Sequence, residues 1–317
     1  MSSLTLIRHL CVEGANAISS PITYGFPAMT QVLGFVHRVQ RLVRQSEDDD
    51  DDDEHAFTIT GFGVVCHRVD VLATYVDGHR GGRKSRFNLT GNPLERTGKR
   101  PSFIEEGKCH LDVSVVLESN HTLDNETLSR VPDIIFAKTR FAAGTIVSPP
   151  RMYPINDDRR SLGKLMPGWG LIERRDLMRE SMAGGRDALE AMHDRLAVRY
   201  QSPSDDDAGD DASGNAGGEK VAWPPGHRMQ PGNIVPVAVG YQALSPVTPS
   251  RNARDRDTPH RFAESVLTLG EFVLPMRLRT PADLLWRPVH EGDLYVCRGA
   301  ELPRNQPSSF PNPNDSE

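Results

Sequence analysis

Few residues in this 317-residue chain have the types and spacing that catalysis requires. Ser19 and Ser20 stand beside Pro21, and serines in such a position more often form turns than act as nucleophiles. His37 has the type of a general base, but a surface histidine contacting phosphate or solvent is the simpler interpretation. The sequence has no Gly-x-Ser-x-Gly elbow, no His-Glu-x-x-His motif and no paired carboxylates outside its acidic runs. We therefore expect no catalytic residue and no enzymatic activity.

The cysteines are too far apart to preassemble a metal site or to indicate a disulfide framework. His67 and His110 each follow a cysteine, but adjacent residues of a strand point to opposite faces. We expect four reduced core thiols, no metal and no cofactor. The four are Cys11, Cys66, Cys109 and Cys297.

The net charge of −6 hides a basic body. Eight acids form the run 47–54, and five aspartates lie within 205–211. Without these thirteen acids, the rest of the chain changes from −6 to +7. Such runs repel themselves and bury no apolar surface, so each is interpreted as a solvated loop, with mimicry of nucleic acid as the alternative.

A basic, glycine-punctuated arm occupies residues 79–100. It is too polar to form a core, and its guanidinium and ammonium groups suit a phosphate backbone. The alternative is a solvated loop with a chance excess of cations. The cations are Arg80, Arg83, Lys84, Arg86, Arg96, Lys99 and Arg100.

Residues 16–44 run from small polar residues through Pro and Gly into a patterned helix. Asn16 and the serines offer hydrogen bonds, and the small residues leave room for a nucleic-acid backbone. His37, Arg41 and Arg44 share one helical face. The junction is interpreted as a seat for single-stranded RNA, and a tightly packed structural turn remains equally open.

The order of predicted elements is that of an α+β protein. Residues 4–12 form a strand with Leu4, Leu6, Leu10 and Val12 on one face, and a helix at about 122–131 ends before Pro132. Further strands are expected at 57–66 and 109–117, then near 234–239, 266–274 and 291–297, with a helix near 186–199. This order favours a modified RNA-recognition (ferredoxin-like) sheet with large inserted arms.

The chain divides into four expected parts. Residues 1–200 form a ferredoxin-like RNA-binding core, with the basic arm inserted at about 79–105 and the acidic loop at 47–54. Residues 201–222 are an acidic flexible loop, 223–300 complete the fold, and 301–317 are a disordered tail. No stretch reaches the roughly 18 apolar residues of a membrane span, and the N-terminus lacks a signal-peptide pattern, so a cytoplasmic protein is expected.

Motifs spread over about residues 5–290 carry a family resemblance. They begin with Asn16-Ala-Ile-Ser-Ser-Pro, Gly25-Phe-Pro and Gly34-Phe-Val-His, and continue through Gly63-Val-Val-Cys-His-Arg, Phe87-Asn-Leu-Thr, Asn92-Pro, Glu105-Glu-Gly, Leu165-Met-Pro-Gly, Leu269-Gly-Glu and Leu284-Leu-Trp. The chain resembles the second subunit, the Csy-two family, of the type I-F CRISPR surveillance complex. It departs from the family pattern in its acidic runs and at Tyr24, where tryptophan is common.

The resemblance implies a non-catalytic subunit that pairs with the large subunit at the tail of the complex, beside the first backbone subunit. The pair would hold the 5′ handle of CRISPR RNA, and the complex would then find double-stranded target DNA. Alternatives are a metal-independent repeat RNA endonuclease and a general RNA-binding assembly module. Rings available for base stacking are Tyr24, Phe26, Phe87 and Trp169. The candidate RNA-binding residues are Asn16, Ser19, Ser20, Tyr24, His37, Arg38, Arg41, Arg83, Lys84, Arg86, Asn88, Asn92 and Trp169.

Overall fold

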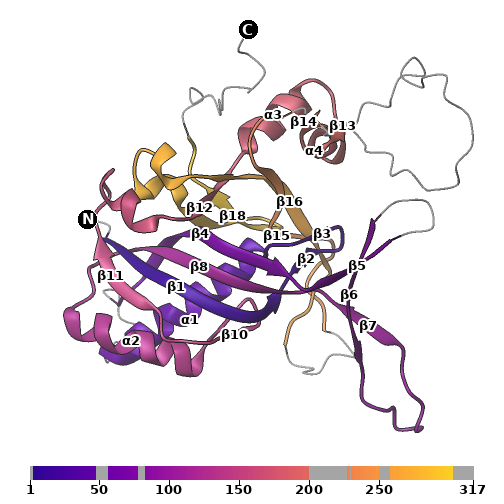
Figure 1. The fold of residues 1–317 in the computed structure, drawn as a ribbon, viewed down its shortest axis with the longest axis horizontal. Coiled ribbons are helices and arrows are strands. Elements are labelled where there is room, and N and C mark those ends of the chain that lie inside the picture. Colours follow the sequence, from indigo (N-terminus) through magenta and orange to yellow (C-terminus); the bar gives the residue numbers. More distant parts are fainter. Residues whose placement is uncertain are drawn as a thin grey trace, which may run out of the picture.

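The computed structural model describes most of the chain, in the ranges 3–47, 56–77, 83–199, 227–228, 230–249 and 258–302. Apart from Glu47, both acidic runs lie outside the described residues, as does the predicted tail beyond Leu302. Within the described part, eleven strands form one large antiparallel sheet (Figure 1). The chain is therefore a mixed α and β protein, as its element order predicts.

The first half of the chain supplies one end of this sheet. Its strands are β1 (Ser3–Asn16), β4 (Ile59–Val71), β8 (Lys108–Ser119) and β11 (Arg151–Ile155). The order across the sheet is β4-β8-β1-β11, and each neighbouring pair is antiparallel. Two short strands, β9 (Arg140–Phe141) and β10 (Gly144–Ile146), extend the edge beside β1.

Two helices cover one face of these strands. Helix α1 (Met29–Glu47) connects β1 with β4, and α2 (Asn125–Lys138) connects β8 with β11. The inward residues of both helices share one core with the alternating side chains of β8. Those β8 residues are Leu111, Val113, Val115 and Leu117, as their alternation predicts.

Helix α2 contradicts the predicted end before Pro132. It begins after Asp124, whose side chain accepts a hydrogen bond from the backbone N–H of Thr127 at 2.7 Å, and it continues past Pro132 to Lys138. A proline inside a helix removes one backbone hydrogen bond. Here Val131, Pro132 and Ile135 are buried, so packing of the helix against the core outweighs that local cost.

Strand β1 also differs from its predicted pattern, because its residues divide between two cores. Leu4 and Leu6 belong to a core on the face opposite the helices, whereas Leu10 lies in the core beneath them. The pairing with β8 shifts register between Ile7 and Leu10, and His9 there has φ +55°. One extra residue in a strand reverses which face each later side chain occupies.

The second half of the chain closes the other end of the sheet into a ring. Strand β12 (Trp169–Glu173) pairs with both β4 and β16. Trp286 of β17 is fully buried where that strand meets β4. The ring is completed by β15 (Ile234–Ala243), β16 (Ala263–Val273), β17 (Trp286–Glu291) and β18 (Leu294–Gly299). The sequence predicts one strand near 291–297, whereas the structure has two strands here, β17 and β18.

Short helices pack around this ring. A second core on the sheet face opposite α1 contains residues of η1 (Ser161–Leu165) and η4 (Pro281–Leu284), and η3 (Pro275–Arg277) lies beside them. Near the predicted helix at 186–199 there are two helices, α3 (Arg175–Ala183) and α4 (Ala188–Leu196), followed by the strand pair β13 (Val198–Arg199) and β14 (His227–Arg228). Among the described residues, no helix is both long and apolar enough to cross a bilayer.

The basic arm is a β-structure rather than a loop. Strands β5 (Ala73–Asp77), β6 (Arg83–Gly91) and β7 (Phe103–Glu106) form a three-stranded sheet inserted between β4 and β8. It projects from the body at the lower right of Figure 1. Polar residues form a strand here because their backbone groups find partners: residues 83–87 of β6 pair with β5, and residues 88–91 pair with β7. We call residues 73–77 and 83–106 the arm.

Three of the four cysteines are buried, and all four are free thiols. Burial raises the pKa of Cys66 and of Cys297 to about 12, and that of Cys109 to about 11. Cys11 is half-buried. Thiols with such pKa values stay protonated and unreactive at neutral pH, in agreement with the predicted core role of the buried three.

Candidate nucleic-acid interface

The junction that follows β1 is a small hairpin of β2 (Ile18–Ser20) and β3 (Thr23–Tyr24). The Asn16 side chain shapes its entry: Nδ2 donates to the Ile18 carbonyl at 2.7 Å, and Oδ1 accepts from the Ile18 N–H at 3.2 Å. The hairpin is also tied to the base of the arm, because the Ala17 N–H donates to the Gly107 carbonyl at 2.9 Å. The polar groups of Asn16 therefore position this hairpin.

The side chains of Ser19 and Ser20 also form hydrogen bonds within the hairpin. The hydroxyl of Ser19 lies 2.8 Å from Thr23 Oγ1, and that of Ser20 lies 2.7 Å from the same atom. Ser20 also accepts a hydrogen bond from the Ile22 N–H and is only 7% exposed. These contacts fix the turn and leave Ser20 little surface to offer a ligand.

The hairpin presents Tyr24 directly to the arm. Tyr24 is 57% exposed, and its ring makes an edge-to-face contact with Phe87 of β6, with 5.2 Å between ring centroids. The other two predicted stacking rings lie elsewhere. Phe26 packs edge-to-face on Phe272, and Trp169 lies at the start of β12, paired with Cys66 of β4. The structure thus joins two of the four candidate rings.

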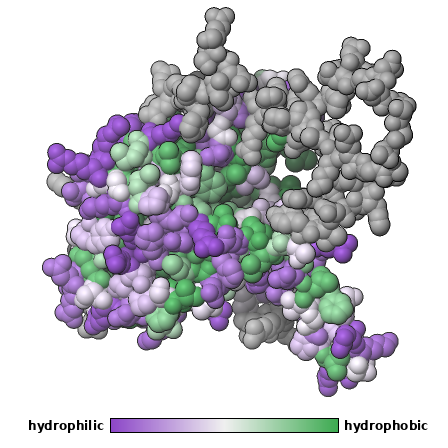
Figure 2. All heavy atoms as spheres, viewed as in Figure 1, coloured by the Kyte–Doolittle hydropathy of each residue, from purple (hydrophilic) through white to green (hydrophobic). Residues whose placement is uncertain are grey.

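The arm carries polar and apolar side chains on exposed strands. Arg86, Asn88 and Asn92 are exposed, and so are the later cations Arg96, Lys99 and Arg100. The backbones of Arg83 and Lys84 belong to β6, but their side chains lie outside the described residues. Apolar residues lie among hydrophilic ones on the projecting arm (Figure 2). The exposed apolar residues are Leu89, Leu94, Phe103 and Ile104.

The basic stripe on α1 is only partly available. His37 and Arg41 are exposed, and Arg38 is half-buried. Arg44 instead donates from Nε to the Phe57 carbonyl at 2.8 Å and from Nη2 to the Thr58 hydroxyl at 3.1 Å, so it braces the segment entering β4. Partial burial, and then the charge of Arg41, lower the pKa of His37, so its ring is neutral at pH 7.

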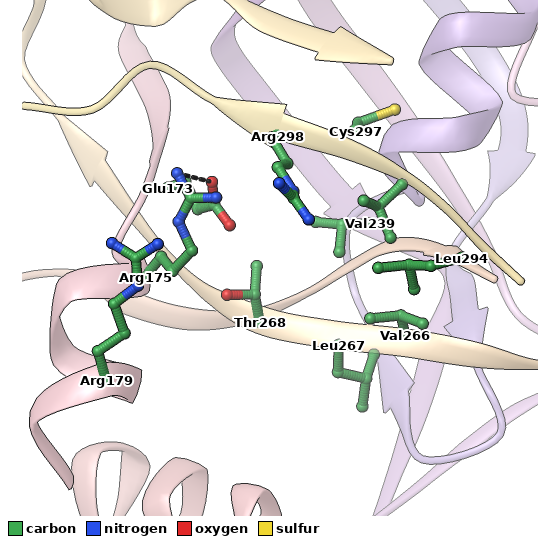
Figure 3. Close-up of a pocket in the computed structure, with 11 residues that line it drawn as sticks. Glu173, Arg175, Arg179, Val239, Val266, Leu267, Thr268, Leu294, Cys297 and Arg298 are labelled. Atoms are coloured by element: carbon green, nitrogen blue, oxygen red, sulfur yellow. Dashed lines mark ion pairs between the residues drawn. The ribbon is translucent and has the colours of Figure 1, made fainter. Parts of the chain in front are cut away.

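A pocket elsewhere on the molecule is lined by three arginines, two from α3 and one from β18 (Figure 3). Arg175 lies 3.8 Å from Glu173 and 3.3 Å from Glu301, and Arg179 lies 3.5 Å from Glu301. Arg298 pairs with Glu291 on the adjacent strand at 2.8 Å. Burial raises the pKa of Glu173, which also accepts from the Gly299 N–H at 2.9 Å. Each arginine already has a carboxylate partner, so the pocket is a structural charge cluster.

Sequence reasoning missed a polar cluster on the face of the sheet opposite α1. His9, His67 and Asp112 come from β1, β4 and β8 and offer ligand atoms within 4.8 Å of one another. Their positions in the chain share no local spacing. The sequence signal that could have found them is weak: charged and imidazole side chains interrupting three otherwise apolar strands.

Comparison with known proteins agrees with the motifs of the sequence. The family model described as CRISPR-associated protein (Cas_Csy2) matches residues 5–297. The chain is 33% identical over 330 residues to the CRISPR-associated protein Csy2 of Pseudomonas aeruginosa (strain UCBPP-PA14), with 93% of this chain and 94% of that protein covered. Both the match of the family model and this identity span nearly the whole chain. It therefore belongs to the CRISPR-associated Csy2 family, the family of the type I-F CRISPR system that its motifs resemble.

Proposed function

We propose that this protein is a non-catalytic subunit of the type I-F surveillance complex that binds the 5′ handle of CRISPR RNA at the tail of the complex. In this proposal it pairs with the large subunit and adjoins the first backbone subunit. Target double-stranded DNA is reached through the assembled complex. RNA would lie against the hairpin of β2 and β3 and the arm.

The arrangement of the first half supports an RNA-recognition-type fold. The main elements follow the order strand, helix, strand, strand, helix, strand, with the sheet order β4-β8-β1-β11, and this order supports a ferredoxin-like split βαβ arrangement. The arm enters between the second and third of these strands. The ring formed by the second half is additional to that fold.

One observation carries the proposal: the contact between Tyr24 and Phe87. It brings the hairpin and the basic arm together, although 62 residues separate the two rings in the chain. Exposed Tyr24 offers a ring for stacking at this contact. Arg86 and Asn88, which flank Phe87 in β6 and alternate with it across the strand, offer phosphate and base-edge donors on the other face of the arm. Asn16, Ser19 and Ser20 act in this site mainly by holding the hairpin that presents Tyr24.

The exposed apolar side chains of the arm support a protein partner beside the RNA. Leu89, Leu94, Phe103 and Ile104 are each at least half exposed on the strands of the arm and on the segment that connects them. Apolar side chains gathered on a projecting element are typical of a protein interface. We assign this role to the neighbouring subunits of the complex, with the arm contacting RNA and protein together.

Loss of arm cations should weaken RNA binding in a salt-dependent manner. Each phosphate contact to a single strand contributes about 0.7 to the slope of log affinity against log salt. We expect Arg86→Ala to lower affinity for handle RNA at low salt and to flatten this slope by about that amount. Arg83→Ala should act similarly, and Arg41→Ala should do so if the RNA continues onto α1. Binding is measured over a salt series with the large subunit present.

The matched control is Arg160→Ala, which removes an exposed arginine from the loop before η1. Arg195 is unsuitable, because it bonds Ser181, Gln230 and Glu180 and so braces α3 and α4. If Arg83→Ala and Arg86→Ala both match Arg160→Ala in affinity and slope, the arm does not bind the handle. If Tyr24→Ala binds the handle with unchanged affinity, the proposed stacking of a base on Tyr24 is wrong.

Purified protein should leave repeat RNA intact in EDTA. A metal-independent ribonuclease needs a base and an acid positioned near one 2′-hydroxyl. His37 lies on α1 and Tyr24 on β3. In the described part of the chain, these two elements do not bring the two side chains together as a base and an acid. Gel analysis of repeat RNA after incubation checks this. A discrete product that His37→Ala abolishes would instead support the endonuclease alternative.

A further inference from the structure

A cluster of three potential metal ligands lies on the sheet face opposite α1. His9 of β1, His67 of β4 and Asp112 of β8 are all partly buried, and their ligand atoms lie within 4.8 Å of one another. The rings of the two histidines are close, with 4.4 Å between centroids. Three strands that are far apart in the chain thus bring two imidazoles and one carboxylate to one point.

Hydrogen bonds fix the state of His67. Its Nδ1 contacts the carbonyl oxygen of Pro167, which can only accept, so Nδ1 carries the proton. Nε2 therefore carries the lone pair, and it lies 2.6 Å from the Ser114 hydroxyl. A backbone carbonyl that holds one imidazole N–H, with the lone pair on the other nitrogen, is the usual arrangement around a metal-ligating histidine.

His9 and Asp112 form the other half of the cluster. His9 Nδ1 lies 3.0 Å from both carboxylate oxygens of Asp112. His9 also has φ +55°, a left-handed conformation that is unfavourable for a residue with a side chain. Its N–H donates to Ser114 Oγ at 3.1 Å, which helps to hold it there. The bulge thereby directs an imidazole toward Asp112.

We propose that His9, His67 and Asp112 bind one divalent first-row transition ion, with zinc as the probe. Two imidazoles and one carboxylate are a common zinc ligand set that leaves a fourth position for water. Donor atoms around such an ion are roughly 3.3 Å apart, given zinc–ligand distances of 2.0–2.2 Å. The ion takes the place of the proton that His9 Nδ1 shares with Asp112, and in the neutral ring this proton moves to Nε2, so that Nδ1 offers its lone pair to the ion.

Binding also requires a small change at His67. Its Nε2 exchanges the Ser114 hydroxyl for the ion, while Ser114 continues to accept from the His9 N–H. Arg8, the neighbouring cation, donates from Nη2 to the Met166 carbonyl at 3.1 Å. Gly168 leaves space beside His67, because a Cβ there would lie 2.8 Å from Nδ1. The Met166–Gly168 segment therefore closes one side of the site.

The test is titration of the full chain, first freed of metal, with Zn²⁺ and with Co²⁺, whose visible absorption reports tetrahedral nitrogen and oxygen ligands. We expect one ion per chain. His9→Asn, Asp112→Asn and His67→Ala should each weaken binding by at least the roughly 10–100-fold that loss of an outer-shell partner costs. Asn at position 9 tolerates the left-handed backbone, so this variant should fold. The control His193→Ala removes an exposed histidine of α4 and should bind as the wild type does.

A second measurement needs no variant. Zinc should protect His9 and His67 of the wild-type protein from carbethoxylation, while the exposed His193 still reacts. The proposal is overturned if the wild type binds no ion, if His9→Asn binds as tightly as the wild type, or if zinc protects neither histidine. An ion that is lost on Cys11→Ser but kept in His9→Asn would also overturn it.

Discussion

Trp286→Ala is expected to lower the free energy of unfolding by about 3–5 kcal/mol, the range for truncation of a large buried aromatic side chain. Trp286 is fully buried and is among the largest fully buried side chains. It pairs with Phe62 of β4 and Gly299 of β18, and its indole N–H donates to the Leu171 carbonyl of β12 at 3.0 Å. One residue thus connects four strands of the ring, and its loss leaves a cavity and an unpaired carbonyl.

Chemical denaturation followed by circular dichroism measures this loss. Trp286→Phe is the informative control, since it keeps most of the volume but not the N–H. We expect it to cost about 1–3 kcal/mol, the penalty for leaving a buried acceptor unpaired. A Trp286→Ala loss below about 1 kcal/mol would contradict the role assigned to this residue, because the loss of so large a buried side chain costs more even where the surrounding structure partly fills the cavity.

Glu271→Ala should be the second large loss, at about 3 kcal/mol. Glu271 is 4% exposed and forms an ion pair with Arg174, whose side chain is 18% exposed. Removing one partner of a buried pair leaves the other charge uncompensated. Arg174 keeps its contact with Asp176 at 2.9 Å, so the loss should fall at the low end of the usual range.

A double-mutant cycle separates the pair from its surroundings. Arg174→Met with Glu271→Leu replaces both charges by apolar groups, and we expect it to be less destabilising than Glu271→Ala alone. Asp293→Ala is the matched control, because it breaks an exposed pair with Arg261 of 2.7 Å and should cost no more than about 1 kcal/mol. Equal losses for Glu271→Ala and Asp293→Ala would show that burial adds nothing to the inner pair.

Elements with strong local patterns could be read from the sequence. The alternation of Leu111, Val113, Val115 and Leu117 predicts a strand with one buried face, and all four lie in the main core. The helical spacing after Pro27 predicts α1, which begins two residues later at Met29. Both signals depend on residues within a few positions of one another, so backbone hydrogen bonding and amphipathicity alone determine them.

Other local signals were outweighed by contacts between distant segments. Pro132 ends a helix by local rules but lies inside α2, because the buried face of that helix continues beyond it. The polar composition of 83–91 indicates a loop, yet β6 pairs with β5 along its first half and with β7 along its second half. Because of the extra residue at His9, Leu4 and Leu6 in the first half of β1 face the core opposite the helices. A bulge depends on pairing with β8, which lies about 100 residues further along the chain.

The candidate sites show the same division between local signals and contacts of distant segments. The sequence by itself determined the basic character of the arm, the polar junction and the motifs that indicated the Csy2 family, since composition and short motifs do not depend on the fold. Only the tertiary structure decided that Tyr24 meets Phe87 and that His9, His67 and Asp112 converge. Each convergence joins residues from different strands, and strand order and register, which place them together, result from the packing of the whole sheet.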